Sequence, residues 1–195
     1  LNGGTILDPA GNASTLTLAS PGASGSLAAN KALIVDTTPA TVSSVSSSTS
    51  NGSFAVDGTI AVTVQFSEVV NVVTTNGTPK IALETGSSDA SVSYSSGTGT
   101  NTLTFTYTVA TGHTSADLDY TSTSALTLNS GTIKDVAGND ATLTLASPGA
   151  SGSLAANKAL VVDGSPPTVS SVSATTSNGT FAVGSAIAIT VTFSE

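Results

Sequence analysis

The side chains best suited to chemistry in this sequence are acids and amides that recur in the same order. Two sets of four supply oxygen ligands, at Asp8, Asn12, Asp36 and Glu68 and again at Asp135, Asn139, Asp163 and Glu195. Ca²⁺ takes six to eight oxygens from carboxylates, amides, backbone carbonyls and water. Carboxylates that converge without a cation would repel one another. Each set therefore predicts a site for one or more Ca²⁺ ions.

The two sets belong to a long internal repeat. Residues 1–68 align with residues 128–195 without a gap, with 51 identities and 17 differences, and the stretch 15–33 recurs unchanged at 142–160. The chain is thus predicted to be a tandem array with a period of 127 residues. Pro39 and Pro166 mark the joints. They divide the chain into the end of one repeat (1–38), a complete repeat (39–163) and the start of a third (164–195), and we expect it to be part of a longer array.

Apolar and polar residues alternate through most of the complete repeat, which is the period of a half-buried strand. The clearest runs are 60–66 and 103–109. Further strands are predicted at 41–47, 79–84, 90–95, 117–120, 124–128, 141–146 and 157–162. No stretch has a helical period. Many short antiparallel strands with frequent turn signals predict an all-β fold, a two-sheet sandwich.

These strands determine where the candidate ligands lie. A strand that leaves Pro39 and an antiparallel strand over 59–67 would bring Glu68 back to the joint. If strand 141–146 runs antiparallel to the last strand, loop 135–140 lies at the same end of the repeat as Asp163. The first joint is then expected to gather Asp8, Asn12, Asp36 and Glu68, and the second joint to gather Asp135, Asn139, Asp163 and Glu195.

Simpler interpretations stay open for these residues. The Asp-x-Ala-Gly-Asn segments at 8–12 and 135–139 suit turns in which Asp and Asn cap backbone amides, and Glu68 suits a solvated rim. Asp117 and Asp119 are weaker metal candidates. They stand two apart on one side of a predicted strand, where solvent exposure is the simpler account.

Composition and charge argue against several classes of function. Only 8% of the residues are charged, against roughly 25% in an ordinary domain, and the net charge of −8 disfavours nucleic acid and anionic lipid as partners. No segment is apolar over the length needed to span a bilayer. The absence of cysteine excludes disulfides and thiolate metal sites and is compatible with a secreted bacterial protein. His113 is the one histidine, so no catalytic set can be drawn and we expect no enzyme.

The phrases Val-Gln-Phe-Ser-Glu-Val-Val (64–70), Gly-Thr-Asn-Thr-Leu-Thr-Phe-Thr-Tyr-Thr-Val (99–109) and Asp-Val-Ala-Gly-Asn (135–139) stand beside an Asp-x-x-Pro joint. Together they resemble the bacterial Ig-like repeats of very large surface proteins and adhesins, and the resemblance covers the whole chain. It implies Ig-like or cadherin-like sandwiches in tandem, acting as non-enzymatic, calcium-stiffened extenders outside the bacterial cell. The implied partners are neighbouring repeats of the same polypeptide.

Two other functions stay open. The scarcity of Lys and Glu to guard strand edges favours self-assembly into a filament or sheath. The outward row Thr102, Thr104, Thr106 and Thr108 is the candidate surface for a carbohydrate or ice ligand, although a solvated strand face explains it more simply. A flat binding array needs matching rows on neighbouring strands, and 91–94 and 122–124 do not obviously continue it.

Overall fold

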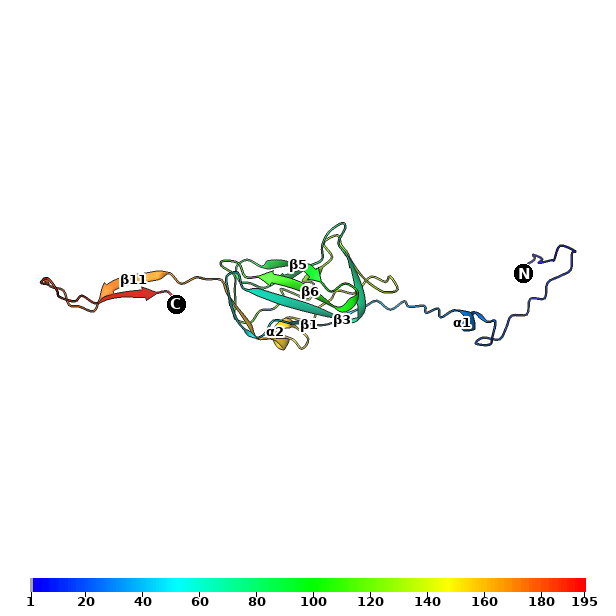
Figure 1. Cartoon of the computed structure of the whole chain (residues 1–195), viewed down its shortest axis with the longest axis horizontal. Helices are drawn as coiled ribbons and strands as arrows, with labels where there is room; N and C mark the ends of the chain where they lie inside the picture. The colour runs from blue at the N-terminus through cyan, green and yellow to red at the C-terminus, as the bar shows by residue number, and fades with distance from the viewer. Residues whose placement is uncertain (1) are drawn as a thin grey trace. The chain divides into compact units, whose positions relative to one another are not determined.

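A computed structural model describes residues 2–195 of the chain. These residues form two compact units, and the boundary along the chain falls between Thr37 and Thr38. The first unit contains one short helix, α1 (Leu27–Asn30), whose first turn is capped by the Ser26 hydroxyl. The second unit contains all of the long strands (Figure 1). None of the helices in the described residues is long and apolar enough to cross a membrane.

The complete repeat is a sandwich of two sheets, which confirms the predicted all-β fold. The larger sheet has the strand order β1-β3-β6-β5-β4-β8, with β9 also paired to β3. Its strands are β1 (Val42–Ser47), β3 (Thr59–Val73), β4 (Lys80–Leu83), β5 (Ala90–Ser96), β6 (Thr100–Thr108), β8 (Leu126–Thr127) and β9 (Thr132–Asp135). The smaller sheet has the order β2-β10-β7 and comprises β2 (Gly52–Ala55), β7 (Thr114–Ser115) and β10 (Leu160–Asp163). β10 runs parallel to β2, so the last strand of the repeat belongs to the smaller sheet.

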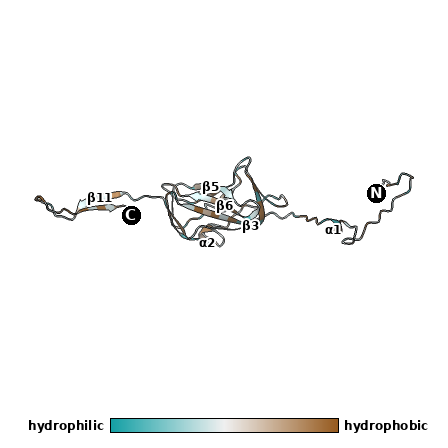
Figure 2. Cartoon of the chain, viewed as in Figure 1, coloured by the Kyte–Doolittle hydropathy of each residue, from teal (hydrophilic) through white to brown (hydrophobic). Residues whose placement is uncertain are grey.

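The core lies between the sheets and is built from alternate residues of the central strands. Ile60, Val62, Val64 and Phe66 of β3 are buried against Leu103, Phe105 and Tyr107 of β6. The residues between them are polar or small, and the alternation can be followed in Figure 2. This burial supplies the main force that holds the two sheets together.

The structure corrects several predicted elements. Residues 141–146 form no strand, because Thr142 makes only an isolated parallel bridge to Thr41. β2, β7, β9 and the four-residue helix α2 (Leu154–Asn157) were not predicted, and β3 continues to Val73. The strand predicted at 157–162 begins only at Leu160, because Asn157 ends α2. Residues 117–120 also form no strand, since only Tyr120 makes a bridge. The short elements β2, β9 and α2 are stabilised by partners that are distant in the sequence, so they leave little periodic signal in their own residues.

The third repeat begins with the same hairpin as the complete one. β11 (Val169–Ala174) pairs with β12 (Ile189–Phe193) in the register that joins β1 to β3, with the bulge at the equivalent place. Phe66 is 2% exposed, whereas its counterpart Phe193 is 53% exposed. The hairpin therefore keeps its backbone pairing without the second layer that buries it in the complete repeat.

Candidate metal centre

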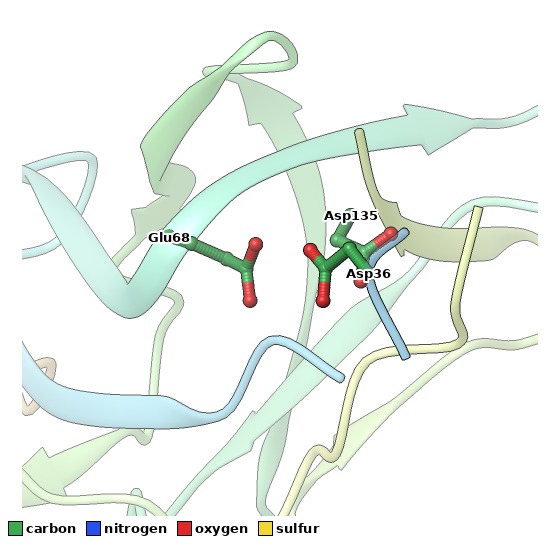
Figure 3. Close-up of side chains that lie close together, drawn as sticks. All are labelled: Asp36, Glu68 and Asp135. Atoms are coloured by element: carbon green, nitrogen blue, oxygen red, sulfur yellow. The ribbon is translucent and has the colours of Figure 1, made fainter. Parts of the chain in front are cut away.

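Three carboxylates from distant parts of the sequence converge on one point. Asp36, Glu68 and Asp135 each offer an oxygen, and these oxygens lie within 4.8 Å of one another. In Figure 3 the Glu68 side chain points toward those of Asp36 and Asp135. Asp36 is exposed, Glu68 is half-buried and Asp135 is buried. The group thus has one side open to solvent and one side fixed inside the protein.

A bulge in β3 positions Glu68. The pairing of β3 with β6 is regular up to Gln65 and resumes only at Val70, so that residues 66–69 are accommodated by a bulge. Bulges bend a strand and re-aim its side chains. The bulge is tied to the start of the repeat, because Ser67 N donates to Thr41 O at 2.8 Å and Thr41 N donates to the Ser67 hydroxyl at 3.0 Å. Glu68 is therefore held beside the segment that follows Asp36 and Pro39.

A tight turn holds Asp135 at the end of β9. One carboxylate oxygen accepts hydrogen bonds from the backbone amides of Gly138 and Asn139, at 2.7 and 2.8 Å. The other accepts from Asn139 Nδ2 at 2.7 Å. Burial raises the pKa of Asp135, but the hydrogen bonds from Asn139, Gly138 and Ala137 outweigh it and leave the pKa below its ordinary value. Asp135 is thus an oriented carboxylate that favours its charged form.

The same turn occurs at Asp8 in the first unit. The Asp8 carboxylate accepts from Ala10 N at 2.9 Å, from Asn12 N at 2.8 Å and from Asn12 Nδ2 at 2.9 Å. These bonds, the Asn12 side chain's first, lower the pKa of Asp8. The Asp-x-Ala-Gly-Asn segment therefore does form the capping turn that was the simpler interpretation. The turn also fixes the carboxylate, with Asn12 and Asn139 using their amide nitrogens to hold the acid.

The predicted grouping of the acids differs from the geometry. Asp135 was expected beside Asp163, but these residues lie at opposite ends of the sandwich. Asp135 pairs with Val70 in β3, whereas Asp163 pairs with Ala55 and Thr114. The cause is the missing strand at 141–146: Thr142 N donates to Ala40 O, which returns the chain after Asp140 to the beginning of the repeat.

Asp163 and Glu195 repeat part of the arrangement. They are the counterparts of Asp36 and Glu68, and they line one surface depression together with Pro166 and Pro167. The structure thus groups the final Asp of one repeat with the Glu and the turn Asp of the following repeat. Metal binding by any of the eight residues stays a prediction.

Two further polar residues have structural partners that the sequence did not indicate. Asp119 is only 8% exposed and accepts backbone hydrogen bonds from Tyr120, Gly149 and Leu154, whereas Asp117 is exposed. His113 Nδ1 lies 2.8 Å from the Tyr107 hydroxyl, and the two rings stack. Burial raises the pKa of Tyr107 to about 12, so this phenol stays protonated. Within the described residues, neither Asp119 nor His113 joins the carboxylate group.

Comparison with known families decides the classification. A sequence model described as the bacterial Ig-like domain matches residues 36–147, which is more than half of the chain. The chain belongs to the bacterial Ig-like domain family. Neither the curated proteins nor the solved structures contain a match to it. Domains of this family are typically non-enzymatic structural units and are commonly extracellular.

The match contains all three converging acids but stops before the Ig-like domain is complete. Its first residue is Asp36, and both Glu68 and Asp135 fall within it. It ends at 147, ahead of α2 and β10, which supply the buried residues Leu154, Leu160 and Val162. In the structure the Ig-like sandwich therefore extends to Asp163.

One ion pair in the Ig-like domain flanks the Asp135 turn and has no counterpart beside the Asp8 turn. Lys134 Nζ lies 2.6 Å from Asp140 Oδ1, and the corresponding residues of the preceding repeat are Leu7 and Ala13. The Asp140 side chain is 78% exposed and the Lys134 side chain is 40% exposed. We expect the double variant K134L/D140A to change the free energy of unfolding by less than about 1 kcal/mol, since exposed ion pairs contribute little. Urea denaturation measures this; a larger loss would mean that the pair holds the Asp135 turn closed.

Proposed function

We propose that the chain is a structural spacer of a large extracellular bacterial protein, in which Ca²⁺ at each joint stiffens the connection between successive Ig-like repeats. The observation that carries this proposal is the convergence of Asp36, Glu68 and Asp135. Asp36 is the last residue before a Pro-containing joint, and the other two belong to the sandwich that follows. A cation held by all three would fasten the joint to the sandwich.

The donor set fits calcium. All three side chains are carboxylates, and the sequence contains no cysteine for a softer metal. Asp135 is already oriented by its turn, so less ordering is needed when an ion binds. The remaining ligands would be backbone carbonyls and water, as is usual for Ca²⁺. The same chemistry would recur at every joint of a tandem array.

Calcium is expected to raise the melting temperature of the chain. A free Ca²⁺ concentration 100 times the Kd stabilises the folded state by about 2.7 kcal/mol, which corresponds to roughly 5–10 °C for a domain of this size. Calorimetry in millimolar Ca²⁺ and in EDTA measures the shift. E68Q should abolish most of the rise, whereas E84Q, which removes an exposed acid elsewhere, should retain it.

The two glutamine variants also test the site without metal. In EDTA, E68Q should be at least as stable as the parent chain, because it removes a charge from a group of three acids. Small-angle scattering in both solutions then measures the dimensions that stiffening would change. Equal calcium responses in E68Q and E84Q, or no response in the parent chain, would contradict the proposed site.

A further inference from the structure

One face of the larger sheet carries no charged side chain across four adjacent strands. This face consists of the alternate, outward residues of β3 (59–65), β6 (102–108) and β5 (91–95), together with Ser44 and Ser46 of β1. Of these thirteen positions, eleven are Ser or Thr, and the others are Ala61 and Gln65. The whole chain has a net charge of −8. We call this surface the hydroxyl face; its strands lie side by side in Figure 1.

The hydroxyls form rows that continue from strand to strand. Thr108 and Thr104 of β6 stand opposite Thr59 and Thr63 of β3. On the other side of β6, the Ser95 hydroxyl lies 3.1 Å from Thr106 Oγ1. The sequence had suggested that the threonine row of β6 ends at its neighbours. The strand order instead places β3 and β5 on either side of it, so that hydroxyls continue onto both neighbours except at Ala61 and Gln65.

The hydroxyl face recurs in the next repeat. Six of its positions, on β1 and β3, have counterparts on the β11–β12 hairpin, which pairs in the same register. Two differ, since Thr59 corresponds to Ala186 and Gln65 to Thr192, and neither difference introduces charge. The differences that do change charge lie elsewhere, at Leu7, Ala13 and Asp57 and their counterparts. The uncharged character of these six positions therefore recurs in the second copy.

We propose that the hydroxyl face pairs with the hydroxyl face of a second copy of this chain, so that arrays associate side by side. A hydroxyl both donates and accepts hydrogen bonds, which makes such a surface complementary to itself. Two acidic copies repel each other in most orientations, whereas none of the thirteen positions of this face carries a charge. The aromatic rings of β6, at Phe105 and Tyr107, point into the core and offer a sugar nothing to stack on.

The area of the face indicates how strong one contact is. Strands about 4.8 Å apart with outward residues every 6.6 Å or so make a face of roughly 400–500 Å², hence roughly 800–1,000 Å² for a pair. That is smaller than a standard specific interface and typical of weak, transient ones. A single repeat should associate weakly, and parallel arrays should associate far more tightly because the contacts act together.

Analytical ultracentrifugation of the whole chain in EDTA, from about 10 µM to 1 mM, tests the pairing. The parent chain should show reversible, concentration-dependent association. Thr104 stands near the centre of the face, so T104E and T104K should each weaken association at least tenfold through like-charge repulsion. An equimolar mixture of T104E and T104K should restore it. S87E, which adds the same charge on an exposed loop, should associate like the parent.

Three results would overturn the proposal. The first is a parent chain that stays monomeric throughout. The second is association that S87E weakens as much as T104E does, and the third is a mixture of the two charge variants that fails to recover. A neutral glycan resin that retains the parent but not T104E, with no self-association, would assign the face to carbohydrate instead. Unchanged melting temperatures of the variants establish that each has folded.

Discussion

Replacing Leu154 by alanine is expected to remove about 2–5 kcal/mol from the free energy of unfolding, the range found for buried leucines. Leu154 begins α2, is 0% exposed and belongs to the main core. Domains of this size are stable by only about 5–15 kcal/mol. L154A should therefore leave a much less stable complete repeat, with a midpoint of urea denaturation well below that of the parent chain.

The chain contains its own control for this substitution. Leu27 occupies the equivalent position in the identical segment 15–33, and it is 69% exposed. L27A should change the free energy of unfolding by no more than about 0.5 kcal/mol, as surface substitutions usually do. Because the local sequences are the same, the difference between the variants measures the tertiary environment alone. Equal losses would mean that 15–33 is buried as 142–160 is.

The same pair of segments shows what the sequence could predict about the fold. Alternation identified β1, β3, β4, β5 and β6, because one face of each of these strands is buried and the other is exposed. It could not identify α2, whose four residues are too few for a helical period, or β9, which exists because β3 continues beyond its bulge. Identical residues in 15–33 and 142–160 have different burial, which no local pattern encodes.

The candidate site was predictable only in part, for the same reason. β3 runs antiparallel to β1 and so brings Glu68 back to the joint. Predicting this position required only the directions of the two strands. The position of Asp135 depends on the path of the chain after Asp140. The strand assumed at 141–146 predicted Asp135 at the Asp163 end of the sandwich, whereas it lies at the opposite end. Asp119 was expected in solvent because polar and apolar residues alternate around it. It is buried where the backbone amides of Gly149 and Leu154, 30 and 35 residues away, donate hydrogen bonds to it.

Replacing Asp119 by alanine is expected to remove roughly 3 kcal/mol or more from the free energy of unfolding, because hydrogen bonds to a charged group contribute about 1.5–3 kcal/mol each and buried amides would lose their acceptor. Its Oδ1 accepts from Tyr120 N at 2.9 Å and from Leu154 N at 3.2 Å, and its Oδ2 accepts from Gly149 N at 2.9 Å. D119N should lose less, since its amide keeps one acceptor oxygen. D117A, at an exposed position, should unfold like the parent.

The consequence of losing Asp119 should reach the edge of the larger sheet. The segment that Asp119 holds covers β1, where Val45 N donates to Gly152 O at 2.8 Å and Asn157 Nδ2 donates to Val45 O at 2.8 Å. Once that segment detaches, β1 has an open edge that can pair with another chain. Hydrogen exchange at the Val45 amide should therefore accelerate in D119A and not in D117A. If exchange there is unchanged while stability falls, Asp119 stabilises the core without holding the cover over β1.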